Sequence, residues 1–217
     1  MTEPQALRID FVSDVSCPWC AVGLASLERA LDALKDEVRA EIHFQPFELN
    51  PQMAREGEDV GEHITKKYGL SRAQLAQNQE NIRQRGAAVG FTFAKQDTRR
   101  IYNTFDAHRL LHWAEDSGQQ HALKRALLTA YFTDGEDVSD HAVLARVAEA
   151  VGLDGNEARA ILAGDRYAAE VRAQEQFFQR AGIHSVPAII INRQHLISGG
   201  QPPEVFEQAL RQIAAAG

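Results

Sequence analysis

The chain has 217 residues, of which 44% are hydrophobic, and a formal net charge of -7. This length and composition allow a well-packed core in one domain, or in one domain that carries a large insertion. The negative charge argues against nucleic-acid binding and against an anionic membrane surface, because phosphate contacts require clustered Lys and Arg.

The first predicted strand covers residues 7–11, where apolar side chains alternate with polar ones. A short polar loop leads into an amphipathic helix, whose leucines recur at steps of three and four: Leu24, Leu27, Leu31 and Leu34. The residues before the strand lack the basic and apolar regions of a secretory signal, and no apolar run could span a bilayer. We therefore expect a cytoplasmic protein that has no membrane partner.

Cys17 and Cys20, the only cysteines of the chain, stand where this strand runs into the helix. A bridge between them would close a very short loop and would stabilise the fold little. Pro18 suits the first helical turn, where unpaired N–H groups and the helix dipole favour the thiolate of Cys17. We expect Cys17 to be the nucleophile and Cys20 to resolve the mixed disulfide that Cys17 forms.

Other interpretations of the cysteine pair are a zinc site and two buried core thiols. A structural zinc ion needs about four N or S ligands, and no second cysteine pair supplies them. His108 and His112 have the i, i+4 spacing of metal ligands but lack the carboxylate of a metalloprotease motif. Free cysteines often behave as small core hydrophobes, yet the strand and helix on either side favour a redox site. We expect neither a metal nor an organic cofactor.

A second strand is expected around Ile42 and Phe44, ending near Pro46. Residues 47–61 form a predicted loop, because Gly, Glu and an Asn-Pro pair interrupt any regular pattern. Residues 62–182 then show consecutive helical patterns without a convincing strand.

Several residues of the helical region are predicted helix caps. Ser71 and Gln74 have the spacing of a capping box, and the helix they begin should end near Gly86. Thr98 and Ser139 are expected to cap two later helices. The first of these two helices should carry four residues on one face: Ile101, Phe105, His108 and His112.

The C-terminal part returns to strands. An apolar run at 188–191, a polar turn and a strand at 195–198 predict a hairpin, and Pro203 begins a final amphipathic helix. The last helix should bury one side, formed by Val205, Phe206, Ala209, Leu210 and Ile213. The order of elements predicts an α/β protein with a discontinuous domain, residues 1–61 and 183–217, and a helical insertion domain, residues 62–182.

This order, with Cys-x-x-Cys at the first strand-to-helix junction, resembles a thioredoxin fold that is interrupted by a large all-helical insertion. Several motifs are similar to the DsbA-like family, which includes FrnE-type proteins and 2-hydroxychromene-2-carboxylate isomerases. These motifs are Asp14 with Cys17-Pro18-Trp19-Cys20, Phe47-Glu48-Leu49-Asn50-Pro51, Asn103-Thr104 with Ala107-His108-Arg109, and Ser185-Val186-Pro187. The similarity runs over nearly the whole chain.

The resemblance implies that Pro187 is cis and faces the cysteine pair, so that the Val186 backbone can pair with an extended substrate. Isomerases and kappa-class glutathione transferases of similar fold have serine at the position of Cys17, and use it to activate the glutathione thiol. Because this chain has both cysteines, we expect a protein thiol–disulfide oxidoreductase or disulfide isomerase. The alternative is a glutathione-dependent transferase or isomerase, with glutathione as co-substrate.

The roles of the residues near the motif are left open. Asp14 is expected to oppose the thiolate, to accept a proton, or to serve as an ordinary loop residue. Trp19 is either a wall for substrate contact or a shield over the disulfide. His184 and Ser185 either line the site or belong to a plain loop.

The resemblance implies a substrate groove that includes Asn103, His108 and Arg109. The expected partners are protein or small-molecule disulfides and thiols. A third hypothesis is a binding module that uses the groove without redox chemistry. The direction of electron flow and the oligomeric state are not predicted.

Overall fold

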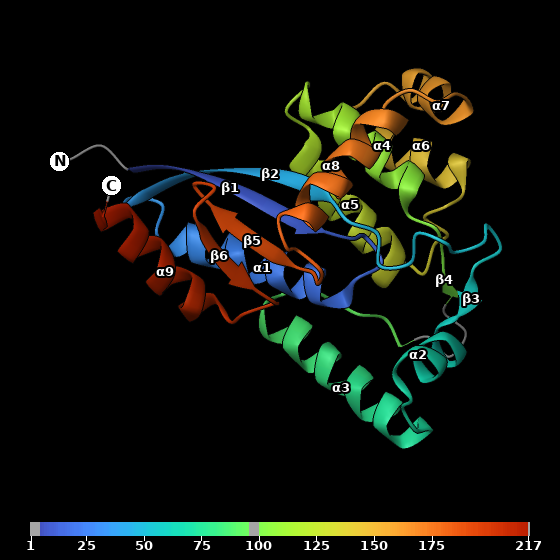
Figure 1. Ribbon diagram of the computed structural model, residues 1–217, viewed down its shortest axis with the longest axis horizontal. Helices are drawn as coiled ribbons and strands as arrows, with labels where there is room; N and C mark the ends of the chain where they lie inside the picture. The colour runs from blue at the N-terminus through green and yellow to red at the C-terminus, as the bar shows by residue number, and fades with distance from the viewer. Residues whose placement is uncertain (1–4, 96–99, 217) are drawn as a thin grey trace.

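The computed structural model describes residues 5–95 and 100–216. Its main sheet combines strands from the N-terminal and the C-terminal parts of the chain (Figure 1). Its strand order is β2-β1-β5-β6. The strands are β1 (Gln5–Ser13), β2 (Val38–Pro46), β5 (Ala188–Ile191) and β6 (His195–Ser198). β1 runs parallel to β2 and antiparallel to β5, and β5 runs antiparallel to β6. β1 is therefore central, and the cysteine motif follows directly from its end.

Nine helices surround the sheet in the described part of the chain. They are α1 (Pro18–Ala33), α2 (Val60–Tyr68), α3 (Arg72–Ala88), α4 (Phe105–Glu115), α5 (Gln120–Phe132), α6 (His141–Ala150), α7 (Gly155–Ala163), α8 (Ala168–Arg180) and α9 (Pro203–Ala216). α1 packs against α9 and α3, whereas α4, α5 and α8 contact β2 (Figure 1). No helix among these residues has the length and apolarity needed to cross a membrane.

The prediction that residues 47–61 are all loop, followed by helices alone, is wrong in one respect. β3 (Glu58–Asp59) pairs antiparallel with β4 (Arg100–Ile101) in a separate two-stranded sheet. Two residues are too few for the alternation that identifies a strand, and the pairing joins segments far apart in the sequence. α2 also begins earlier than expected, because the Asp59 side chain accepts a hydrogen bond from the backbone N–H of Glu62.

The observed helix caps agree only in part with those predicted from the sequence. Ser71 and Gln74 form the predicted capping box of α3. Asp140 caps α6 in place of Ser139, because the Asp140 carboxylate accepts hydrogen bonds from the first turn. Thr98 lies outside the described residues, and α4 begins at Phe105.

The expected face of α4 is wrong at Ile101, because Ile101 belongs to β4. The predicted stripe of α1 is buried at Leu24, Leu27 and Leu34 and half-buried at Leu31. In α9, Phe206 and Leu210 are buried, but Val205 is 41% exposed. The expected apolar sides are therefore mostly buried, and Val205 in the first turn of α9 is the exposed exception.

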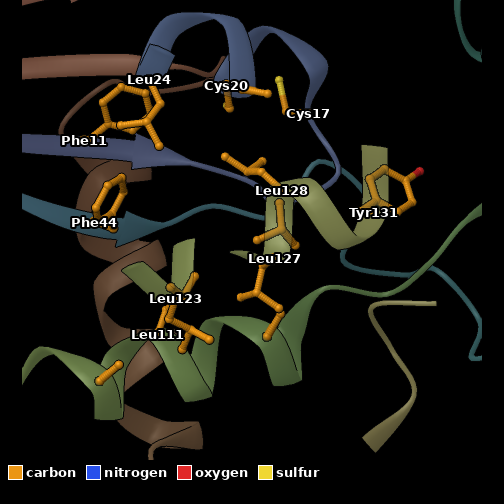
Figure 2. Close-up of a cluster of buried hydrophobic side chains, with 14 of the residues drawn as sticks. Phe11, Cys17, Cys20, Leu24, Phe44, Leu111, Leu123, Leu127, Leu128 and Tyr131 are labelled. Carbon is orange, nitrogen blue, oxygen red and sulfur yellow. The ribbon is translucent and has the colours of Figure 1, made fainter. Parts of the chain in front are cut away.

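One apolar core joins the sheet to the helical region. Phe11, Leu24 and Phe44 belong to the same buried cluster as Leu111 of α4 and Leu123 of α5 (Figure 2). The helices after α3 therefore complete the core of the sheet. The division at residues 61 and 182 into two domains stays a prediction.

Candidate active site

The two cysteines lie at the start of α1 as a free dithiol. Cys17 is the N-cap residue, and Pro18 occupies the first turn. Cys17 and Cys20 lie 3.3 Å apart, and neither forms a disulfide. Cys17 is 4% exposed and Cys20 is fully buried, so a reagent reaches Cys17 first.

The Val186–Pro187 segment faces Cys17 from the start of β5. The Val186–Pro187 peptide bond is cis. The Cys17 thiol donates a hydrogen bond to the carbonyl oxygen of Val186, with 3.7 Å between sulfur and oxygen. A Cβ atom on Gly23 would lie 3.1 Å from Pro187 Cγ, so glycine permits this close approach of α1 to the proline. Segments distant in the sequence thus form one site.

Cys20 is held as a thiol by its surroundings. Burial raises the pKa of Cys20 well above its ordinary value, and the adjacent Cys17 raises it further. The Cys20 N–H donates to the carbonyl oxygen of Cys17 at 3.0 Å. A neutral, buried second thiol is suited to the resolving step, in which it must lose a proton only after the first thiol has reacted.

Asp14 anchors the loop that precedes Cys17. Its carboxylate accepts hydrogen bonds from the Leu49 N–H at 2.8 Å and from the Ser16 hydroxyl at 3.1 Å, and lies 3.4 Å from His108 Nε2. Burial would raise the pKa of Asp14, but the adjacent His108 and the hydrogen bond from the Leu49 N–H outweigh burial and hold this pKa below its ordinary value. Asp14 therefore joins the active-site loop to α4 as a buried anion.

The residues expected to form a groove divide into two groups. His184, Ser185, Val186 and Trp19 line a cavity in front of Cys17. His108 and Arg109 are buried beneath the site, and Arg109 donates to the carbonyl oxygens of Ile161, Gly164 and Arg166.

The Asn103 side chain also forms hydrogen bonds with backbone groups. Its side chain accepts a hydrogen bond from the Phe105 N–H at 3.0 Å and donates to the Met53 carbonyl at 3.4 Å. None of Asn103, His108 and Arg109 lines the cavity.

The cavity in front of Cys17 has a volume of about 1100 Å³. Cys17, Trp19 and Val186 form one wall, and the opposite wall comes from α2 and α3. The α3 wall presents carboxamides and one guanidinium: Asn78, Gln79, Asn81, Gln84 and Arg85. Sequence reasoning missed this wall, because these polar residues have the pattern of a solvated helix face.

Glu48 is the one carboxylate among the residues that line this cavity. Its carboxylate pairs with Arg172 of α8, which also pairs with Glu175. Burial and the charge of Glu175 raise the pKa of Glu48, and Arg172 opposes both effects. In the described part of the chain, no group of three His, Cys, Asp or Glu side chains is arranged to hold a metal ion.

Comparisons with known proteins agree with this fold. Residues 8–211 match the family of DSBA-like thioredoxin domains. The uncharacterised protein YwbO of Bacillus subtilis is 27% identical over 205 residues, which cover 94% of this chain and 96% of YwbO. The crystal structure of a probable DsbA oxidoreductase from Streptomyces coelicolor is 39% identical, with a TM-score of 0.90, and the match covers 97% of this chain and 90% of that chain.

A more distant solved structure shares the fold alone. The cytosolic disulfide reductase DsbM of Pseudomonas aeruginosa, solved with GSH, is 15% identical with a TM-score of 0.64. The match covers 96% of this chain and 99% of DsbM. These similarities confirm the expected thioredoxin-like α/β fold with a helical insertion.

Proposed function

Since the chain belongs to the DsbA-like thioredoxin family, we propose that it is a thiol–disulfide oxidoreductase that acts through Cys17 and Cys20. The position of Cys17 carries this proposal. Cys17 is a free thiol at the N-cap of α1 and lines the cavity, with Cys20 3.3 Å away. A helix N-terminus favours a thiolate, which is the nucleophile in disulfide exchange.

The exchange proceeds in two steps. The Cys17 thiolate attacks one sulfur of a substrate disulfide, the substrate S–S bond breaks, and the other substrate sulfur leaves as a thiolate. Cys20 then loses its proton and attacks Cys17 Sγ, which breaks the mixed disulfide and releases the second substrate thiolate. The substrate gains two electrons, and the protein becomes a disulfide. The reverse sequence oxidises a substrate dithiol.

The neighbouring residues bind and orient the substrate in this proposal. The Val186 backbone pairs with an extended partner, while Trp19, His184 and Ser185 contact it along the cavity. Neither a metal nor an organic cofactor takes part. The partners are protein or small-molecule disulfides and thiols. We place the activity in the cytoplasm, because the chain has no cysteine outside this pair that would require an oxidising compartment.

The proposal is tested with insulin and dithiothreitol. The wild-type protein should accelerate precipitation of the insulin B chain, and Cys17→Ser should not. Cys20→Ser should accumulate a mixed disulfide through Cys17, detectable by mass spectrometry, whereas Cys17→Ser should accumulate none. If the wild-type protein does not accelerate reduction and Cys20→Ser traps nothing, the proposed function is wrong.

The cavity favours one second candidate, a glutathione-dependent transferase or isomerase. Its volume of about 1100 Å³ and its carboxamide wall suit a peptide-sized thiol, and DsbM was solved with GSH. Glutathione conjugation needs no resolving thiol. Turnover that depends on glutathione and is unchanged in Cys20→Ala would favour this candidate over disulfide exchange.

A further inference from the structure

Lys124 of α5 is a fully buried cation for which the chemistry above has no use. Its side chain is 0% exposed, and its Nζ has no hydrogen-bond partner among the described residues. Nζ lies over the ring of Phe44, 5.9 Å from the ring centroid. An ammonium group in such surroundings is costly without a nearby negative charge.

The helix geometry directs this face of α5 toward the cysteines. Leu127 and Leu128 follow Lys124 by three and four residues, and residues at these spacings share a helix face. Leu128 lies between α5 and the cysteine pair (Figure 2). A cavity of about 10 Å³, close to the size of one water molecule, borders Lys124 and is lined also by His108 and His112.

The titratable groups around Lys124 come from three other elements. They are Cys17 and Cys20 of α1, Asp14 of the preceding loop, and His108 and His112 of α4. β2 and α8 contribute only uncharged residues to the lining of the adjoining cavity: Phe44, Gln45 and Pro46 from β2, and Gln174 from α8. Asp14 and the cysteines are therefore the groups near Lys124 that can carry negative charge.

These negative charges differ in their dependence on redox state. Burial lowers the pKa of Lys124, while the charges of Cys20 and Asp14 act in the opposite direction. The charge of Asp14 does not depend on the disulfide, because its carboxylate contacts Leu49, Ser16 and His108 and neither cysteine side chain. A cysteine thiolate, in contrast, exists only in the reduced protein. Formation of the disulfide removes the negative charge that favours the ammonium form of Lys124.

We propose that Lys124 binds a proton while Cys17 and Cys20 are reduced and releases it when their disulfide forms. This inference rests on the proposed function. In the reduced site the cysteine pair carries one thiolate and one thiol, and Lys124 is an ammonium. Reaction with a disulfide RSSR yields the Cys17–Cys20 disulfide, a neutral Lys124 amine and two RSH. Two electrons pass to the substrate, and its two sulfurs receive the protons of the remaining thiol and of Lys124.

The first test observes Lys124 itself. The chain has five lysines, and the ε-carbon resonance of each reports its protonation by NMR. The Lys124 signal, identified by its loss in Lys124→Met, should show an ammonium in the reduced protein and an amine in the oxidised protein at the same pH. The same protonation in both redox states would overturn the inference. If Lys124→Met does not fold, Lys124→Arg supplies the assignment.

The second test measures how many protons are released on oxidation, from the pH dependence of the equilibrium between the protein and glutathione. At pH values where thiolate absorption shows one thiolate on the cysteine pair, wild-type oxidation should release one more proton than oxidation of Lys124→Met. Each protein has an equilibrium constant for oxidation by glutathione disulfide. The ratio of the wild-type constant to that of Lys124→Met should change by about tenfold per pH unit, since one additional proton contributes one power of ten per unit. Leu127→Met, a buried change on the same helix, should behave as wild type.

The outcomes separate the two proposals. Equal pH dependence in wild type and Lys124→Met would overturn the role of Lys124 and leave the proposed function intact. A wild-type cysteine pair that does not equilibrate with glutathione or dithiothreitol would overturn both.

Discussion

Arg85 of α3 donates a hydrogen bond to the carbonyl oxygen of Gly200, with 2.9 Å between Nη2 and the oxygen. The same guanidinium lies over the indole of Trp19, 5.7 Å from the ring centroid. One side chain thus holds the α3 wall of the cavity against both the first turn of α1 and the segment between β6 and α9. The width of the route to Cys17 depends on this contact.

Arg85→Ala should open the cavity. Loss of a hydrogen bond worth about 1 kcal/mol should increase the population of open forms roughly fivefold. The alkylation rate of Cys17 by a bulky maleimide should rise by a similar factor, while the rate with iodoacetamide should change less. Arg83→Ala is the matched control, because the ion-pair partner of Arg83 among the described residues is Glu80 on its own helix. Equal rates in wild type and Arg85→Ala would show that α3 does not limit access.

Gly200→Ala should damage the site by crowding. An added Cβ would lie 2.8 Å from the carbonyl oxygen of Trp19, so the first turn of α1 would have to move. We expect a loss of about 1–3 kcal/mol in the free energy of unfolding by urea, together with slower disulfide exchange. Gly164→Ala is the control, because its Cβ would meet no atom closer than 3.8 Å. Equal losses in both variants would contradict the crowding argument.

Asp14→Asn should destabilise the protein in a way that depends on pH. The folded-state pKa of Asp14 lies below its ordinary value, so the folded protein binds fewer protons at this group than the unfolded chain. Its stabilisation is present above a pH of about 4 and is lost as the pH falls through the folded-state pKa. At neutral pH the variant should lose about 1–3 kcal/mol.

The difference from wild type should shrink on acidification, as measured by urea unfolding at several pH values. Asp36→Asn, at an exposed position, should show no such trend. If the free energy of unfolding of Asp14→Asn stays below that of wild type by a constant amount down to acidic pH, the carboxylate charge is not the cause of the lost stability.

Lys124→Met should stabilise the oxidised protein. Burial lowers the pKa of Lys124 in the folded state, so the unfolded chain binds more protons at this group. Wild-type stability should therefore rise with pH between the folded-state value and about 10.4. The variant should lack this contribution and gain about 1–3 kcal/mol near neutral pH, because methionine replaces an amine that must lose its proton and its water hydrogen bonds on burial. Lys35→Met, at an exposed position, controls for the loss of a surface charge in denaturant titrations.

Local patterns were sufficient for the elements that carry the cysteines. The alternation in β1 and the leucine spacing in α1 reflect contacts of each element with the core, so a few neighbouring residues reveal them. The position of Cys17 and Cys20 at the start of α1 was predictable because the motif occupies four consecutive residues. The β3–β4 pairing was not predictable, because it depends on the return of the chain near Arg100.

The electrostatic part of the site also depends on packing. The contact between Asp14 and His108 requires α4 to lie against the active-site loop, which no local pattern specifies. Lys124 did leave a signal, since Leu123, Leu127 and Leu128 surround it on its helix. A charge placed within such an apolar stripe is a candidate for burial.

The short β3–β4 ladder joins residues 58–59 to residues 100–101. The segment that contains α2 and α3 therefore has its two ends side by side. A segment whose two ends lie side by side can be shortened, replaced or lengthened at a small cost in loop-closure entropy. Such a change need not move the ends of β1 or β5. The cavity wall can thus vary in sequence and shape independently of the dithiol, so one redox centre can be fitted to different substrates.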